Sequence, residues 1–301
     1  MLARRLEPRS NPFPEDRLAT LDDLTFLPAN LTRLVIDPYR EACRIDTELG
    51  AGRFTMTAPF LATGFDDAPD QVRRAVAEGL RTGGCPYVGV RPIAEDVPWL
   101  QLVLPGQIAP SADTTAQIHA LGHQFRPVEA TRLTDDQLLG LSVSSPDVLE
   151  ETIPFALENG FDMLLLDGSR GLGTPWAELS GEPDLTILRD AVTILRRLRR
   201  EEEIDLVFFG GVRSGTDTAK LIAMGSMAVI LGVILGLAVG GEINASHEMQ
   251  FAADRSDAER AEAVANILTA SAQEASMMAR CTGKTNLHNV EPEDLRAISK
   301  A

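Results

Sequence analysis

Residues 206–217 read LVFFGGVRSGTD, and residues 227–232 read MAVILG. Both stretches are short apolar runs that lead into glycine, which predicts two buried strands, each followed by a tight turn. Glycine lets a backbone come close to an anion, turn amides point at the anion, and Arg213 adds positive charge. Phosphate commonly binds at the ends of strands seven and eight in (β/α)8 barrels. The pair therefore predicts a phosphate site, with two ordinary strand-to-helix turns as the alternative.

Short apolar runs alternate with helix-like stretches along most of the chain, and an eighth strand is expected between Gln107 and Asp135. Near-continuous apolar strands separated by helices are typical of a parallel sheet covered on both faces. The number of strands favours a (β/α)8 TIM barrel over an open doubly wound sheet. The expected strands are Pro59–Thr63, Pro86–Val90, Leu100–Leu104, Leu139–Val143, Met163–Leu166, Leu206–Phe209 and Met227–Leu231, and the expected helices are Asp70–Leu80, Pro146–Asn159, Asp184–Glu201 and Thr216–Met224.

The barrel expected from this pattern occupies residues 56–250, between two flanking segments. Residues 1–55 carry several prolines and little strand periodicity, which predicts an N-terminal cap. Residues 251–301 predict a C-terminal helix and tail packed on the barrel. The helix, at 254–279, is rich in alanine and is expected to expose Glu259, Arg260 and Glu262.

The chain of 301 residues has a formal net charge of −16. Such a surface repels nucleic acid and anionic membranes, so neither is an expected partner. The 3 cysteines are too far apart for a zinc pattern and odd in number for a disulfide framework, which favours a reducing compartment. No signal peptide is apparent, so a cytoplasmic protein is expected. Residues 221–241 are long and uncharged enough for a membrane span, but their glycines favour a helix end, a buried strand and a second helix.

Polar residues end three of the expected strands, where the active sites of barrels lie. Asp167 opens a glycine-rich loop and could orient a ligand hydroxyl or cap the next turn. Thr63 could lie beside a planar ring or simply end its strand. The serines at 142–145 are better explained by helix capping than by catalysis. His119 and His123 could share a helix face, but no further ligands accompany them, so no metal site and no catalytic residue is predicted.

Four segments occur in the order found in one known family. Residues 21–33, 166–174, 210–220 and 277–295 resemble the FMN-binding synthase domain of the glutamate synthase large subunit family. Residues 65–135 match it weakly and are shortened. Four ordered motifs are a more specific signal for the fold than the glycine turns alone.

The resemblance implies a barrel that binds FMN. Members of the family use the reduced flavin to convert an imine of 2-oxoglutarate and ammonia into glutamate, with electrons entering through an iron–sulfur cluster. For this chain it implies a small amino or oxo acid substrate, a homo- or hetero-oligomer, and a separate electron-donor or amidotransferase subunit. The implied FMN-binding residues are Thr63, Ser142, Asp167, Gly168, Gly210, Gly211, Arg213, Ser214, Gly215, Leu231 and Gly232.

The chain also departs from the family pattern. The family places its cluster-binding cysteines soon after the eighth strand, but residues 232–250 contain none, so no iron–sulfur cluster is expected. Ser142 stands where the family has a lysine near the flavin ring. The loop after the second strand has become 90–96, where Arg91 could supply a cation from a new direction. The family's amidotransferase domain has no counterpart in the sequence.

Two functions remain open. The first is an FMN-dependent oxidoreductase of glutamate-synthase type, which performs imine reduction or amine oxidation with electrons from a separate partner. The second is a degenerate, non-catalytic barrel that serves as a structural or regulatory subunit of a larger complex. The choice depends on whether the turns after strands seven and eight converge on one anion, and on whether side chains fill the hollow that they share.

Overall fold

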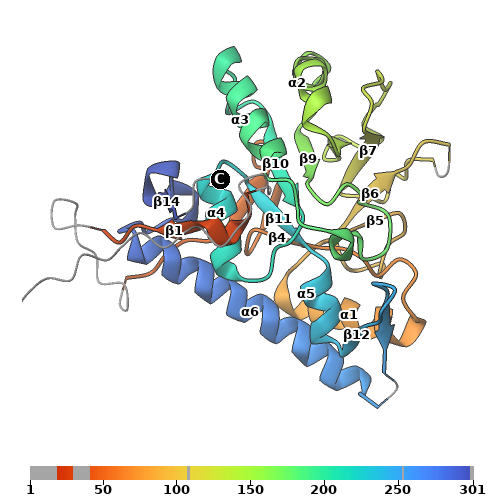
Figure 1. Ribbon diagram of the computed structural model, residues 1–301. Coiled ribbons are helices and arrows are strands. Elements are labelled where there is room, and N and C mark those ends of the chain that lie inside the picture. Colours follow the sequence, from red (N-terminus) through yellow and green to blue (C-terminus); the bar gives the residue numbers. More distant parts are fainter. Residues whose placement is uncertain (1–18, 30–40, 107–108, 253, 299–301) are drawn as a thin grey trace, which may run out of the picture.

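The computed structural model describes residues 19–29, 41–106, 109–252 and 254–298. At its centre is a closed barrel of parallel strands in the order β10-β11-β4-β5-β6-β7-β8-β9 (Figure 1). This confirms the predicted TIM-barrel fold, and the expected eighth strand is β7. The barrel strands are β4 (Phe60–Ala62), β5 (Tyr87–Gly89), β6 (Trp99–Val103), β7 (Ala116–Gly122), β8 (Leu138–Val143), β9 (Met163–Asp167), β10 (Asp205–Phe209) and β11 (Ala228–Leu231).

Alternate residues of each strand point into the barrel or out toward the helices, as the period of a strand requires. The inward set is apolar and forms its own core, which includes Leu61, Val88, Ile118 and Val207. The outward set packs under the helices in a second, larger core. The barrel is therefore a packed layer of side chains and not a channel.

Helices cover only part of the barrel wall. They are α1 (Asp70–Gly83), α2 (Leu149–Glu158), α3 (Thr186–Leu198), α4 (Gly215–Ala223), α5 (Val233–Ala238) and α6 (Asp257–Cys281). In the described part of the chain, no helix follows β5, β6 or β7. The apolar stretch 221–241 is divided among the end of α4, strand β11 and α5, and no helix among the described residues is long and apolar enough to cross a membrane.

Loops and polar side chains replace the missing helices outside β6 and β7. Gln101 donates to the carbonyl of Ala109 at 3.1 Å and accepts from the amide of Ser111 at 2.8 Å. Gln117 donates to the carbonyl of Thr131 at 3.2 Å. Both glutamines are fully buried, so these bonds satisfy amide groups that would otherwise be costly to bury.

The chain ends and two hairpins complete the fold. A 3-10 turn (Leu21–Asp23) leads into β1 (Leu24–Phe26), which pairs antiparallel with β14 (Leu295–Ala297). Strands β2 (Thr47–Leu49) and β3 (Phe54–Met56) form a hairpin whose Leu49 and Met56 extend the inner core. Strands β12 (Gly241–Ile243) and β13 (Met249–Phe251) form a second hairpin. Part of the predicted cap, 1–55, lies outside the described residues.

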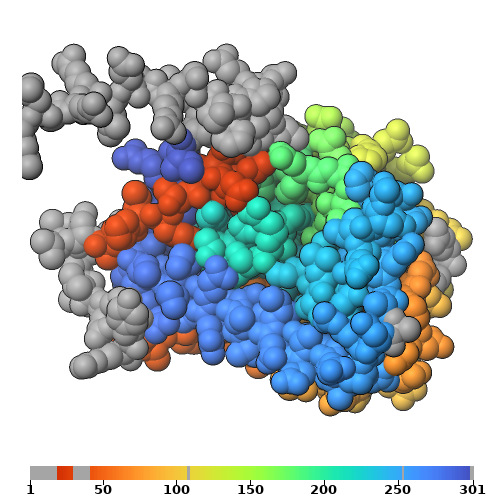
Figure 2. All heavy atoms as spheres, turned by 60° about the horizontal axis from the view of Figure 1, so that its bottom comes forward, coloured from red at the N-terminus to blue at the C-terminus, as the bar shows by residue number. Residues whose placement is uncertain are grey.

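Helix α6 crosses one face of the molecule and packs on α1 and α4 (Figure 2). Glu259 and Glu262 are exposed as expected, but the expectation for Arg260 is wrong because this side chain is only 1% exposed. Its guanidinium donates to the carbonyls of Val239 at 3.2 Å and Arg255 at 2.8 Å. Arg260 thus ties α6 to the end of α5, a tertiary role that the helical period alone does not reveal.

Candidate functional site

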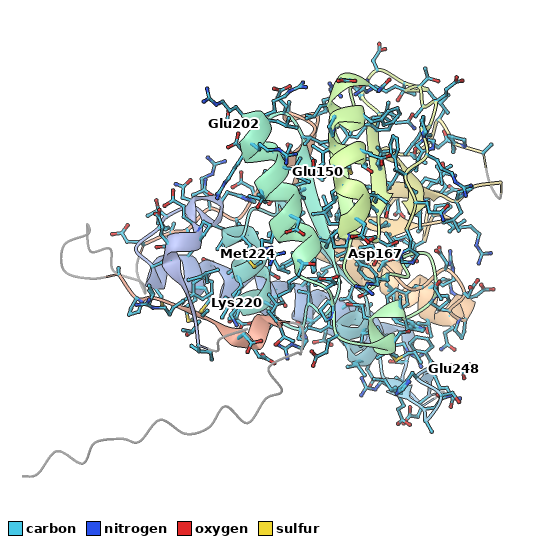
Figure 3. All side chains as sticks on the ribbon, turned by 45° about the horizontal axis from the view of Figure 1, so that its top comes forward. Glu150, Asp167, Glu202, Lys220, Met224 and Glu248 are labelled. Carbon is cyan, nitrogen blue, oxygen red and sulfur yellow. The ribbon has the colours of Figure 1, made fainter. Side chains whose placement is uncertain are left out.

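The carboxyl ends of the barrel strands meet at one end of the barrel, here called the mouth. Thr63, Ser142 and Asp167, which the sequence places at the ends of apolar runs, lie buried there. The hydroxyl of Thr63 donates to the carbonyl of Val88 at 2.8 Å, and its amide donates to Leu231 at 3.0 Å. Asp167 lies among the strand ends, in contrast to Glu202 and Glu248 on the periphery (Figure 3).

The loop after β9 folds into the mouth and closes it. We call residues 171–181 the strap. Its Leu172 and Ala177 pack against the inner core of the barrel. Two small cavities remain there, one lined by Leu172 and Trp176 and the other by Gly64 and Thr174, with Thr63 at both. Each has a volume of about 10 Å³, which is room for one water molecule at most. The mouth is therefore filled by the chain itself.

Glu178 of the strap meets the two glycine turns after β10 and β11. Its carboxylate accepts from the amide of Val233 at 2.7 Å, and the amide of Gly211 lies close enough to lower the pKa of the group. A Cβ on Gly232 would come within 2.2 Å of the Glu178 Oε2 atom, so only glycine leaves space for this contact. The turns converge on one oxyanion as the sequence predicts for a phosphate site, but that oxyanion is the chain's own carboxylate.

Asp167 adds a second carboxyl group to the mouth. Its Oδ2 atom accepts from the amide of Leu172 at 2.8 Å, whereas Oδ1 is buried without a hydrogen-bond partner. Burial away from water raises the pKa of Asp167, and this effect outweighs the nearby backbone amides, which lower the pKa. Burial likewise raises the pKa of Glu178 to about 7, and the charge of Asp167 adds to this shift. Two carboxyl groups in so dry a site oppose the entry of a further anion.

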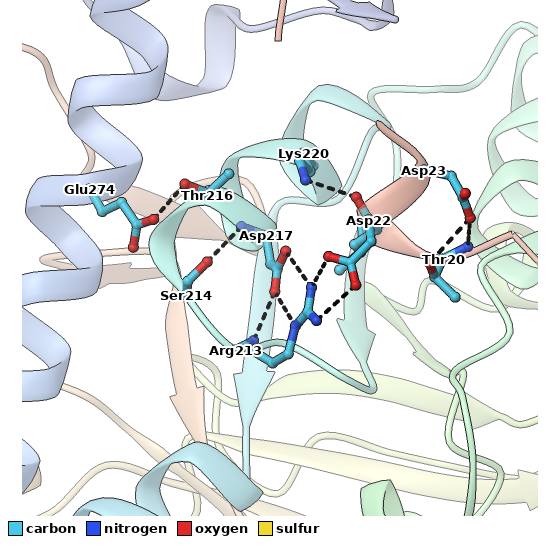
Figure 4. Close-up of polar contacts among 10 residues, drawn as sticks. Thr20, Asp22, Asp23, Arg213, Ser214, Thr216, Asp217, Lys220 and Glu274 are labelled. Atoms are coloured by element: carbon cyan, nitrogen blue, oxygen red, sulfur yellow. Dashed lines mark hydrogen bonds and ion pairs between the residues drawn. The ribbon is translucent and has the colours of Figure 1, made fainter. Parts of the chain in front are cut away.

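Arg213 lies away from Glu178 and serves a different contact. Its guanidinium donates to both oxygens of Asp22, at 3.0 and 2.6 Å, and its Nε donates to Asp217 at 3.0 Å (Figure 4). Lys220 donates to the carbonyl of Leu21 at 2.8 Å. These bonds tie the 3-10 turn near the N-terminus to α4.

The other predicted cofactor residues fall into two groups. Ser214 caps α4 by accepting from the amide of Asp217 at 3.2 Å, and the amide of Gly215 donates to Glu274 of α6 at 2.9 Å. Both residues therefore lie at the start of α4, where Gly215 packs against α6. The second group lies at the carboxyl ends of neighbouring strands, beside the closed mouth, and consists of Gly168, Gly210 and Leu231.

The predicted helical pairing of His119 and His123 is wrong, because His119 lies on β7 and His123 in the loop that follows. The outward face of β7 carries polar side chains, so the sequence has no continuous apolar run there by which to recognise the strand. The Nδ1 atom of His123 instead lies 3.2 Å from the hydroxyl of Ser144. Within the described ranges, no three His, Cys, Asp or Glu side chains are placed to hold a metal ion.

Sequence reasoning missed Leu172, Trp176 and Glu178, the three strap residues that fill the mouth. The strap has no helical or strand period, and its glycines and proline indicate only a loop. A leucine and a tryptophan within a glycine-rich strand-end loop were the available signal, because exposed loops rarely carry large apolar side chains. Nothing local in the sequence predicts the partner of Glu178.

Comparisons with known proteins identify a family and a fold that agree with the observed barrel. The model of the family described as the conserved region in glutamate synthase matches residues 40–285. The chain is 34% identical over 177 residues to a glutamate synthase large subunit-like protein of Rhizobium meliloti (strain 1021), covering 48% of this chain and 40% of that protein. It is 24% identical over 202 residues to an archaeal-type glutamate synthase (NADPH) of Thermotoga maritima, covering 64% of this chain and 38% of that protein.

Among solved structures, a flavocytochrome b2 variant with sulfite bound superposes with a TM-score of 0.62 at 15% identity, over 92% of this chain and 77% of that one. This likeness shows a shared fold. The chain spans about two fifths of the length of the curated relatives that it matches.

Proposed function

The chain belongs to the glutamate synthase family, and from this premise we propose that it is a member with a closed cofactor site, serving as a non-catalytic structural or regulatory subunit of a larger complex. The closed mouth is the observation that carries the proposal. Sites for small molecules and cofactors usually enclose several hundred cubic ångströms, roughly 300 to 1,000 Å³. Each of the two cavities at this mouth, at about 10 Å³, is far below that range.

The residues at the mouth do not fit FMN, the cofactor that the family resemblance implies. Glu178 occupies the amide of Val233 and lies beside the amide of Gly211, two donors that a phosphate would need. Asp167 adds a second acidic group, and Arg213 is engaged with Asp22 and Asp217. A phosphate dianion would therefore meet carboxyl groups, while the guanidinium of Arg213 is already paired with two others.

Flavin binding tests the proposal directly. The purified full chain should show no flavin absorbance near roughly 450 nm, and titration with FMN should neither quench flavin fluorescence nor raise the melting temperature. A member of the family that carries bound FMN serves as the positive control. Stoichiometric flavin in the purified protein, or saturable uptake of added FMN, would contradict the closed site.

Size-exclusion chromatography of the native lysate then tests the subunit role, because the chain should elute in a complex larger than its own 32.5 kDa.

A second candidate is the FMN-dependent oxidoreductase of glutamate-synthase type, acting on a small amino or oxo acid with electrons from a separate protein. The convergence of the Gly211 and Val233 amides on one oxyanion favours it. Thr63 and Asp167, for which the resemblance implies FMN binding, are buried at the mouth. This candidate requires the strap to leave the mouth, and saturable FMN uptake would support it over the closed barrel.

A further inference from the structure

Glu178 makes the contacts that a bound anion would make. The amide of Val233, after β11, donates to its carboxylate at 2.7 Å, and the amide of Gly211, after β10, lies close enough to lower the pKa of the group. A side chain that only filled space would need no such donors. The Glu178 carboxylate therefore sits in a preformed oxyanion site.

The backbone around this site is shaped for close approach. Gly211 has φ of +63°, a left-handed conformation that favours glycine, and Gly232 leaves no space for a side chain beside the carboxylate. The methyl carbon of Thr63 would lie 3.5 Å from a Cβ on Gly232. The close approach of Gly232 to the Glu178 carboxylate thus depends on the absence of a side chain at position 232.

The strap that carries Glu178 is anchored at two further points. The amide of Leu172 donates to Asp167 at 2.8 Å. The ring of Trp176 packs edge-on against Phe65 with centroids 5.1 Å apart, and its centroid lies 5.8 Å from that of Phe251. Trp176 has φ of +56°, which costs free energy for a residue with a large side chain. The surrounding contacts therefore hold the strap in a conformation that the local chain disfavours.

We propose that Glu178 is a tethered replacement for the anionic group of a ligand, which keeps the strap in the mouth and the oxyanion site closed to phosphate and phosphate monoesters. The inference rests on the proposed function, since it explains how the cofactor site is closed. Asp167 is the other carboxyl group facing the site, and it contributes repulsion toward an incoming anion without touching the two turn amides.

Removal of the carboxylate tests the inference. Inorganic phosphate is the probe, added to the full chain at constant ionic strength against chloride, and binding is followed by the amide chemical shifts of Gly211 and Val233. The wild-type protein should show no phosphate-dependent shift at these amides. Glu178→Ala should show a saturable shift of both amides, with an apparent affinity at least about tenfold above that of wild type, an increase worth about 1.4 kcal/mol.

Glu202→Ala is the matched control, because it removes one exposed carboxylate far from the mouth. It should behave as wild type toward phosphate. A folded Glu178→Ala protein that binds phosphate no better than Glu202→Ala would overturn the inference. The same titration is repeated with FMN, which is a phosphate monoester. Uptake of FMN by Glu178→Ala but not by wild type would show that Glu178 excludes phosphate monoesters as well as free phosphate.

A wild-type measurement covers the case in which Glu178→Ala does not fold. The Gly211 and Val233 amide shifts should titrate together with one midpoint near pH 7, because both report the ionisation of Glu178. Independent midpoints, or shifts that do not titrate, would overturn the inference. The two proposals fail separately: FMN binding by the wild-type protein contradicts the closed site, whereas the absence of phosphate binding by folded Glu178→Ala contradicts only the role of Glu178.

Discussion

Arg213 belongs to a predicted phosphate-binding turn, but its side chain stabilises the fold. It follows the glycine turn after β10, where a cation could hold a phosphate, yet it pairs with Asp22 and Asp217. Asp217 is almost completely buried, and it also accepts from the backbone amide of Arg213 at 3.1 Å. The i, i+4 spacing of Arg213 and Asp217 at the start of α4 makes this pair local, and Asp22 extends it to the N-terminal segment.

Substitution of Arg213 by alanine should therefore affect stability. We expect Arg213→Ala to lower the free energy of unfolding by about 1 to 2 kcal/mol, because buried Asp217 loses a charged partner, while exposure of the guanidinium limits the loss. Denaturant unfolding measures the change. Arg197→Ala, which removes a fully exposed pair with Glu150, is the control and should change stability little. Equal effects of the two substitutions would contradict a structural role for Arg213.

The sequence predicted the positions of mouth residues better than their partners. Thr63 and Asp167 end apolar runs, and the ends of parallel strands must meet at one end of a barrel, so their burial at the mouth follows from local pattern. The partners of Arg213 and Glu178 lie far away in the sequence, at Asp22 and Val233. Such contacts depend on how loops fold over the barrel, which no local period encodes.

At the scale of elements, apolar runs located every barrel strand except β7, including β5 and β6, which no helix follows among the described residues. Strands β9, β10 and β11 are buried on both faces and read as continuous apolar runs. Strand β7 instead places Gln117 and His119 on its outer face, beneath polar loops. Its apolar period was therefore broken, and its position between Gln107 and Asp135 was expected only from the strand count.

The packing of α1 against α6 depends on glycine. A Cβ on Gly79 would lie 2.5 Å from the Cβ of Val264 and 2.6 Å from the carbonyl oxygen of Ala261. Gly83 approaches Leu268 in the same way, one helical turn further along α1. These glycines let two helices come closer than larger residues allow, which places α6 against the barrel.

Gly79→Ala should therefore destabilise the protein although alanine is the better helix former. The gain in helix propensity is about 1 kcal/mol, whereas forcing a methyl group into a packed contact typically costs about 1 to 3 kcal/mol. We expect a lower melting temperature together with faster hydrogen exchange in α6. Gln71→Ala, at an exposed position of α1, should leave both unchanged. A stabilised Gly79→Ala protein would mean that α6 shifts easily and that the close contact is not required.

For the whole molecule, both ends of the barrel hold a carboxyl group with a raised pKa. Burial raises the pKa of Glu178 at the mouth to about 7. At the opposite end, burial raises the pKa of Asp205 to about 6, and the charge of Asp162 adds to the shift. Asp205 accepts from the amide of Gly50 at 2.7 Å, which holds the β2–β3 hairpin against that end. Closure of the barrel at both ends thus places acidic groups where their ionisation is costly.

The sign of the resulting pH dependence follows from proton binding. Unfolded Glu178 ionises near its ordinary pKa of 4.5 and Asp205 near 3.8, so between these values and about 7 and 6 the folded state binds more protons. Stability must then fall as pH rises through that window, by at most about 3 kcal/mol for each group.

Glu178→Gln should flatten the upper part of the decline and make the protein more stable than wild type at pH values above the raised pKa of Glu178. Urea unfolding across this pH range measures both effects, with Glu202→Gln as the control for the loss of one negative charge from a chain of net charge −16. If Glu178→Gln and Glu202→Gln gave the same pH profile, general charge repulsion and not burial at the mouth would set the pH dependence.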